Sequence, residues 1–161
     1  MSTTICKERP DTESASMLIE ELEAVLSPMY PDESRHGYSI DQLIAQKVEF
    51  FVLYHNGEPV GCAGVQFFIE QENAGEDNGT YGEVKRMYVR DGFRGLGFAK
   101  RLLQHLEEQT VAQGIVRLRL ETGIYQMEAV KLYEKSGFYR IGPFGEYRDD
   151  PLSLYFEKRL A

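Results

Sequence analysis

The dipeptide Asn56-Gly57 stands between two segments, 48–55 and 59–69, that are rich in β-branched and aromatic residues. Asn-Gly is the strongest short-range signal for a two-residue hairpin loop, because both residues tolerate positive φ. A third strand-like segment, 80–89, follows an acidic and apolar-poor stretch, 70–79, for which we predict an exposed hairpin loop. The first half of the chain is therefore predicted to form an antiparallel sheet.

The hydrophobic period changes after residue 96, where Leu102, Leu103 and Leu106 fall on one helical face. These leucines predict a helix at 97–113. The other predicted elements are a strand at 3–9, a helix from Thr12, a short helix capped by Ser39, a strand at 115–121, a helix at 127–136, and strands at 138–141 and 152–158. This order predicts an α/β (α+β) fold with a mixed, largely antiparallel central sheet flanked by helices, including one βαβ unit. We expect one domain over residues 1–161.

The composition limits the partners of the chain. It has 161 residues, is 42% hydrophobic and carries a formal net charge of −8. An acidic surface repels nucleic acids and anionic membranes, so we expect neither as a partner. The N-terminus lacks an apolar leader and no apolar run approaches the ~20 residues of a membrane span, which favours a cytoplasmic location. Two cysteines, Cys6 and Cys62, form no disulfide framework, and no motif indicates a metal site.

Residues 83–101 carry the clearest chemical signal. A strand leaves through 90–93, and a helix opens at Gly95 and Gly97. The first turn of a helix presents unpaired N–H groups and a partial positive charge, and glycines let a phosphate reach that backbone. Basic residues are concentrated here against a single acid, Asp91, namely Lys85, Arg86, Arg90, Arg94, Lys100 and Arg101. The segment therefore predicts a site for one specific polyanionic ligand.

Two common phosphate motifs fit this segment poorly. A P-loop needs Lys and Ser/Thr after its last glycine, whereas Phe98-Ala99 follow Gly97. A dinucleotide fingerprint needs a small residue where Lys100 stands. Glu121 nevertheless ends the next strand at the distance expected of a ribose-binding acid, so a nucleotide-binding α/β protein remains an alternative.

Two other motifs point to a known family. Residues 94–99 (RGLGFA) resemble the Arg/Gln-x-x-Gly-x-Gly/Ala signature of the GNAT superfamily of N-acetyltransferases. Residues 129–138 (AVKLYEKSGF) resemble the superfamily's A-x-x-L-Y-x-x-x-G-F segment, and 120–123 and 142–151 resemble a bacterial subgroup of small GNAT proteins, mostly uncharacterised. The resemblance implies the GNAT acyl-CoA N-acyltransferase fold and acetyl-CoA-dependent transfer of an acetyl group to a primary amine, directly and without a covalent enzyme intermediate.

The resemblance also assigns cofactor-binding residues. It implies that backbone amides hold the pyrophosphate of acetyl-CoA at Arg94, Gly95, Leu96, Gly97, Phe98 and Ala99. The backbone of Met87, Tyr88 and Val89 would pair with the pantetheine like an added strand. Lys100 and Arg101 would meet the remaining phosphate. Gln126 stands where the superfamily often has an Asn that contacts the cofactor.

The acceptor chemistry requires a base and an acid. An alkyl amine with a pKa near ~10 is only ~0.1% neutral at pH 7, so the site must remove a proton. Glu83, beside the expected cofactor strand, is the first candidate, although it could instead be a surface carboxylate that pairs with Lys85. Glu121 is the alternative base, or a ligand for the substrate ammonium. Tyr133 stands where the superfamily often has its general acid, although a Tyr at this helical spacing is also typical of a core.

The acceptor itself is left open by the sequence. Arg35 and His36 could read a substrate carboxylate, since Arg forks onto carboxylates, or could form a solvated loop. Phe144 and Tyr147 could wall the acceptor pocket or cover the core. The acidic composition is compatible with cationic acceptors, and the two indications conflict. A small-molecule or amino-acid-like amine is expected, a homodimer is left open, and a non-catalytic acyl-CoA-binding module is the alternative function.

Overall fold

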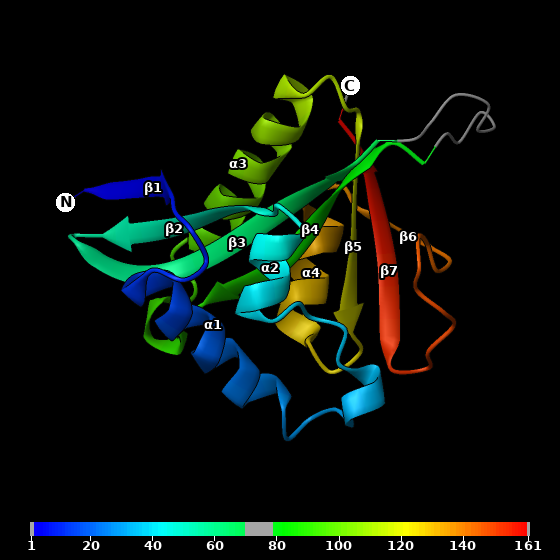
Figure 1. Cartoon of the computed structure of the whole chain (residues 1–161), viewed down its shortest axis with the longest axis horizontal. Coiled ribbons are helices and arrows are strands. Elements are labelled where there is room, and N and C mark those ends of the chain that lie inside the picture. The colour runs from blue at the N-terminus through cyan, green and yellow to red at the C-terminus, as the bar shows by residue number, and fades with distance from the viewer. Residues whose placement is uncertain (1, 70–78, 161) are drawn as a thin grey trace.

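The computed structural model describes residues 2–69 and 79–160 (Figure 1). In these ranges, seven strands form one sheet in the order β1-β2-β3-β4-β5-β7-β6, in which β4 and β5 run parallel and every other neighbouring pair is antiparallel. The strands are β1 (Thr3–Lys7), β2 (Glu49–His55), β3 (Glu58–Phe68), β4 (Tyr81–Val89), β5 (Arg117–Gly123), β6 (Tyr139–Ile141) and β7 (Ser153–Arg159). The predicted mixed, largely antiparallel sheet is confirmed. The hairpin loop predicted over 70–79 lies, apart from Gly79, outside the described residues.

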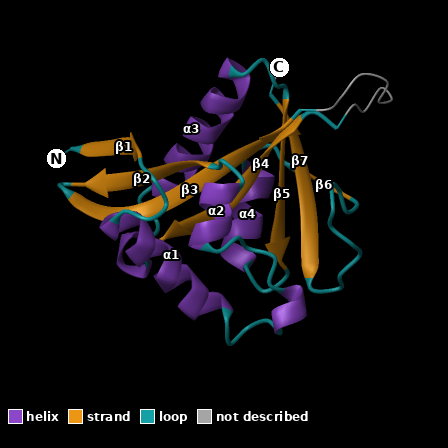
Figure 2. Cartoon of the chain, in the orientation of Figure 1, coloured by secondary structure: helices purple, strands orange, loops and turns teal. Residues whose placement is uncertain are grey.

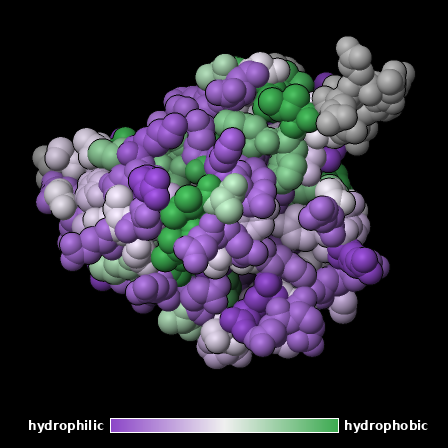
Figure 3. Space-filling model, viewed as in Figure 1, coloured by the Kyte–Doolittle hydropathy of each residue, from purple (hydrophilic) through white to green (hydrophobic). Residues whose placement is uncertain are grey.

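Four α-helices of the described part of the chain flank the sheet. They are α1 (Glu13–Leu26), α2 (Ile40–Ala45), α3 (Phe98–Ala112) and α4 (Met127–Lys135), with short 3-10 turns at Asp32–Ser34 and Asp91–Phe93. Helices α1 and α2 cover one face of the sheet, and α3 and α4 cover the other (Figure 2). The face that carries α1 and α2 is largely hydrophilic outside, with small separate hydrophobic areas (Figure 3).

Local signals in the sequence explain where the elements begin. Asn56 and Gly57 adopt φ of 52° and 83°, the conformation that a two-residue primed turn requires, so the predicted hairpin is confirmed. Thr12 accepts a hydrogen bond from the amide of Ala15, and Ser39 caps α2 with a full capping box. Strand β5 starts two residues later than the predicted 115, because the amide of Ile115 still donates to Thr110 at the end of α3.

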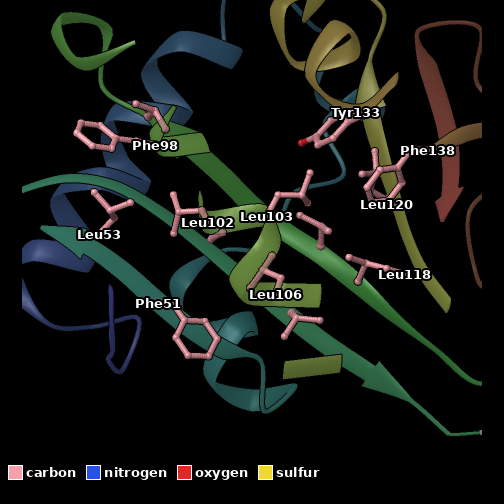
Figure 4. Packing of buried hydrophobic residues seen from close by; sticks show 14 of the residues in the cluster. Phe51, Leu53, Phe98, Leu102, Leu103, Leu106, Leu118, Leu120, Tyr133 and Phe138 are labelled. Carbon is pink, nitrogen blue, oxygen red and sulfur yellow. The ribbon is translucent and has the colours of Figure 1, made fainter. Parts of the chain in front are cut away.

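The core lies in two layers, one on each face of the sheet. Leu18 of α1 and Leu43 of α2 pack on one face. On the other face, Leu102 and Leu106 of α3 meet Leu118 of β5 (Figure 4). These side chains are fully buried. The amphipathic periods that predicted the helices therefore also select the residues that attach them to the sheet.

Strands β4 and β5 are neighbours over a short distance only. Their ladder joins Gly82 to Leu118 and Glu83 to Arg119, and within the described residues it extends no further. Strand β5 stays paired with β7 as far as Gly123. Strand β4 also contains a bulge against β3 near Arg86, whose φ is 52°. The carboxyl ends of β4 and β5 therefore diverge and leave a wedge-shaped gap in the sheet.

The core on the α3 face predicts a stability difference within one helix. We expect Leu106→Ala to lower the free energy of unfolding by about 2–5 kcal/mol, because Leu106 is fully buried and its truncation leaves a cavity. Val111→Ala is the matched control, because Val111 lies in α3 with 49% of its surface exposed and should change stability by at most about 0.5 kcal/mol. Urea denaturation of the two variants measures both values, and equal losses would contradict this description of the core.

Candidate active site

The gap between β4 and β5 contains a cavity of about 130 Å³, here called the wedge cavity. Residues 84–87 of β4 and 120–123 of β5 form two of its walls, and Gln126, Ala129 and Tyr133 close it from α4. A second and larger hollow of about 1100 Å³, the outer groove, lies between the loops that contain residues 31–38 and 145–152. Parallel strands that separate at their carboxyl ends commonly create binding crevices of this kind.

Four residues line both hollows: Ser34, His36, Lys85 and Tyr147. The ring of His36 meets that of Tyr147 edge-on, with 5.7 Å between centroids, and its Nε2 lies 3.1 Å from Oδ2 of Asp150. The ammonium of Lys85 lies 4.0 Å from the centroid of the Tyr38 ring. A polar wall drawn from both loops and from β4 therefore separates the wedge cavity from the outer groove.

Glu83 lies at the base of this wall. Its Oε2 accepts hydrogen bonds from Nζ of Lys85, at 2.8 Å, and from the hydroxyl of Tyr147, at 2.6 Å. The sequence analysis considered Glu83 as a surface carboxylate paired with Lys85; the pair exists, but Glu83 is only 2% exposed. Burial raises the pKa of Tyr147, and the adjacent Glu83 carboxylate raises it further, so the phenol keeps its proton and acts as a donor.

Glu121 faces the wedge cavity from β5. Its Oε2 accepts a hydrogen bond of 2.8 Å from the hydroxyl of Ser153 on the neighbouring strand β7. Burial raises the pKa of Glu121 above the ordinary glutamate value, while the Ser153 hydrogen bond and the nearby His36 oppose that shift. A buried carboxylate with a raised pKa beside a cavity is a candidate acid or base.

Tyr133 lies on the α4 side of the wedge cavity and is 4% exposed. Its ring packs against Phe138, with 5.8 Å between centroids, and its hydroxyl points away from Phe138 and Leu120 (Figure 4). Burial raises the pKa of Tyr133, and the charge of Glu121 raises it further, so the phenol carries its proton throughout the physiological range. Tyr133 is thus both a core residue and a cavity residue, and its catalytic role stays a prediction.

The N-terminus of α3 is open to solvent. Residues 94–97 are exposed, and Gly95 and Gly97 adopt φ of 78° and 83°. A Cβ at either glycine would meet no atom within 4 Å, so backbone conformation rather than crowding requires glycine here. No side chain caps this 15-residue helix, which leaves its first-turn amides available to an anion.

The six basic residues of 85–101 do not form the single patch that the sequence analysis predicted. Four of them pair with other groups of the protein: Lys85 with Glu83, Arg86 with Glu23, Arg90 with Glu21 and Glu58, and Arg94 with Asp91 and the carbonyl of Val89. Lys100 and Arg101 are exposed and form no ion pair with another described residue. Charge counting along the chain does not show these ion pairs with Arg86 and Arg90, because Glu21 and Glu23 come from α1 and Glu58 from β3.

Gln126 lines the wedge cavity, and its Oε1 accepts a hydrogen bond of 3.1 Å from the hydroxyl of Tyr30. That hydroxyl in turn accepts a hydrogen bond from the amide of Tyr125, at 3.0 Å. Tyr30 and Arg86 are cavity residues that the sequence analysis did not identify as such. Tyr30 gave no local signal, because its partners lie 95 and 96 positions further along the chain.

The structure brings three of the four predicted acceptor-site residues to the cavities. Arg35 lines the wedge cavity and donates to Oε2 of Glu23 at 3.3 Å, and it also pairs with Asp32. His36 and Tyr147 line both hollows. Phe144 lines neither of them; it packs against Tyr81 and Tyr155, in line with the core-covering alternative.

Within 2–69 and 79–160, no group of three or more His, Cys, Asp and Glu side chains is arranged to hold a metal ion. None of the helices in these ranges combines the length and the apolar character needed to cross a bilayer.

Comparisons with known proteins show the family of the chain. The family model described as "Acetyltransferase (GNAT) family" matches residues 16–138. The chain is 41% identical over 159 residues to the IAA acetyltransferase of Azospirillum brasilense, covering 99% of each chain. It superposes on a proposed acyl-CoA N-acyltransferase from Klebsiella pneumoniae with a TM-score of 0.79 and 31% identity, covering 99% of this chain and 98% of the other.

The fold is also shared with a more distant structure, the PaiA N-acetyltransferase of Thermoplasma acidophilum in complex with coenzyme A. The TM-score is 0.72 at 18% identity, and 99% of each chain is covered. The family match extends over most of the chain, including both motifs and strands β2 to β5. The chain is therefore a member of the acetyltransferase (GNAT) family.

Proposed function

We propose that the protein is an acetyl-CoA-dependent N-acetyltransferase that moves an acetyl group directly to the primary amine of a small molecule. The observation that carries the proposal is the wedge cavity, in which Glu121 and Tyr133 face the same space between β4 and β5. Family membership and the coenzyme A complex of the Thermoplasma relative support it.

The residues around α3 fit the cosubstrate. When bound, acetyl-CoA supplies an acetyl group activated as a thioester. The amides of residues 95–99 at the start of α3 would hold its pyrophosphate, whereas the amide of Arg94 already donates to the carbonyl of Asp91. The exposed Lys100 and Arg101 would meet the remaining phosphate. Residues 87–89 lie where the β4–β5 ladder has ended, so their backbone has no β5 partner and could pair with an extended pantetheine chain, although the carbonyl of Val89 also accepts a hydrogen bond from Nε of Arg94. Gln126 would contact the same chain from the start of α4.

Glu121 is the proposed base, in place of Glu83, which the sequence analysis put first. Glu121 lines the wedge cavity, and burial raises its pKa toward the range in which a carboxylate accepts a proton from an ammonium group more readily. Glu83 is committed to two donors on Oε2, and its proposed role is to position Lys85 and Tyr147.

Tyr133 is the proposed general acid. It retains its proton at neutral pH and lines the cavity beside Glu121, so it would donate that proton to the departing thiolate. Direct transfer is supported by the two cysteines. Neither Cys6 nor Cys62 lines the wedge cavity, and burial raises the pKa of Cys62 to about 12, which leaves its thiol unreactive at neutral pH.

The cosubstrate is tested by thermal stability. A ligand at ~100 times its Kd should stabilise the fold by about 2.7 kcal/mol, so acetyl-CoA is expected to raise Tm and Gly97→Glu to abolish the rise. Gly114→Glu is the matched control, because Gly114 follows α3 at its opposite end with a similar φ of 76° and equally open surroundings. A rise with NAD or ATP but not with acetyl-CoA would contradict the proposal.

The two carboxylates are separated by their pH profiles. Because the pKa of Glu121 is raised, we expect kcat/KM for the amine to fall as pH drops through a value above the ordinary 4.5. Glu121→Gln should lower kcat by about 10²–10⁴-fold and remove that acidic limb. Glu83→Gln should keep the acidic limb of the pH profile and lose less activity than Glu121→Gln. The opposite ranking, measured by release of CoA thiol, would return the role of base to Glu83.

The acid is tested by removing one hydroxyl. Tyr133→Phe keeps the ring that packs on Phe138, so we expect Tm to be retained while kcat falls by about 10²-fold or more. Unchanged turnover would remove Tyr133 from the chemistry. Binding of acetyl-CoA by the wild-type protein with no turnover of any amine would instead favour an acyl-CoA-binding module.

A further inference from the structure

Arg86 adopts a backbone conformation that its side chain does not favour. Its φ is 52°, in the left-handed region, and it lies at the bulge in β4, a central strand of the sheet. Lys47 and Asn56 are the other non-glycine residues with positive φ among those described, and both lie in connections between elements. An unfavourable backbone conformation held inside a sheet is more often found at a functional site than elsewhere.

The strained backbone directs a guanidinium into the interior. The Arg86 side chain is 3% exposed, and its Nη2 donates to Oε1 of Glu23 at 2.8 Å. Its Nε is buried and has no hydrogen-bond partner among the described residues. Gly37 packs directly on this group, since a Cβ there would lie 2.0 Å from Nη1. The covering loop therefore has no side chain at the point where it crosses Arg86.

Arg35, from the same loop, brings a second guanidinium to this place. Its Nη1 donates to Oε2 of Glu23, and its Nε is likewise buried, with no partner in residues 2–69 and 79–160. Arg35, Arg86 and Glu23 all line the wedge cavity. Asp32 also pairs with Arg35, but its side chain is 90% exposed and solvent screens its charge. Two cations thus share one cavity-lining carboxylate and leave positive charge in excess on this wall.

The cavity has the opposite character on its β5 side, where Glu121 provides a carboxylate whose hydrogen bond comes from the neutral hydroxyl of Ser153. An ammonium group is attracted to that wall. Guanidinium groups bind carboxylates with two parallel hydrogen bonds, so a carboxylate is attracted to the Arg35 and Arg86 wall. The two indications that conflicted in the sequence therefore belong to two walls of one cavity.

We propose that Arg86 and Arg35 recognise a carboxylate on the acceptor, and that the acceptor is a zwitterion, an amino acid whose amino group faces Glu121. Arg86 is thereby a specificity-determining residue at the bulge of β4. This inference rests on the proposed N-acetyltransferase function and adds the class of amine. The carboxylate of Glu23 holds both guanidinium groups in position from α1.

The test compares acceptors that differ by one group. The twenty standard amino acids are offered with acetyl-CoA, and each one that reacts is compared with the amine that lacks its α-carboxyl group. We expect the amino acid to be preferred in kcat/KM. Arg86→Gln should raise the KM of the amino acid by about 10–100-fold, the loss expected for a charge-assisted hydrogen bond. The KM of acetyl-CoA and of the amine without a carboxyl group should not change.

Two further variants control for structure. Arg90→Gln removes a guanidinium that also pairs with a glutamate of α1 but lines neither hollow, so it should leave the amino-acid preference intact. Arg86→Lys retains the positive charge and loses the two parallel N–H donors of the guanidinium group. It should therefore weaken the preference for the amino acid only partially. An equal loss by Arg86→Gln for both members of a pair would make Arg86 a structural residue and overturn the proposal.

A binding measurement separates this inference from the proposed function. In the presence of CoA, an amino acid is expected to raise Tm of the wild type and not of Arg86→Gln. If acetyl-CoA binds but no amine is turned over, the proposed catalysis fails, and carboxylate-dependent binding still supports the Arg86 and Arg35 site. If simple amines react while no carboxylate-bearing acceptor reacts or binds, the catalytic proposal stands and the carboxylate site is wrong.

Discussion

The candidate site depends on the place where one ladder of hydrogen bonds ends. Strands β4 and β5 are joined at two residue pairs, after which β5 follows β7 and β4 follows β3. The divergence opens the sheet at its centre, where side chains from both strands and from α4 can face one space. Had the ladder continued, Glu121 and Tyr133 would lie over a closed sheet and there would be no cavity for a reaction.

The sequence predicted those features that are encoded by near neighbours. The Asn56-Gly57 turn, the helix from Thr12, the Ser39 cap and the glycine-rich start of α3 each depend on a few adjacent residues, and all were identified correctly. The order of the elements followed from their hydrophobic periods. Two periodic helices and two motifs were enough to indicate the family before any distance was known.

The residues that make up the site were harder to predict from the sequence, because their contacts join segments that are distant along the chain. His36 meets Asp150 across 114 positions, and Tyr30 meets Tyr125 across 95. The positive φ of Arg86 arises from the register between β3 and β4, which no local pattern records. The ion pairs of Arg86 and Arg90 were hidden for the same reason, because their carboxylate partners come from α1 and β3.

The divergence of β4 from β5 also sets how the protein exchanges its amide hydrogens. On its β3 side, β4 is held in a continuous ladder apart from the bulge. On its β5 side, the backbone beyond Glu83 has no strand neighbour among the described residues. Deuterium uptake should therefore differ between alternate residues of β4, faster for amides that face β5 than for amides that face β3. An extended ligand bound along the β5 side would slow exchange of the faster amides. Amide exchange in β4 therefore reports whether a ligand lies along the side of the strand that faces β5.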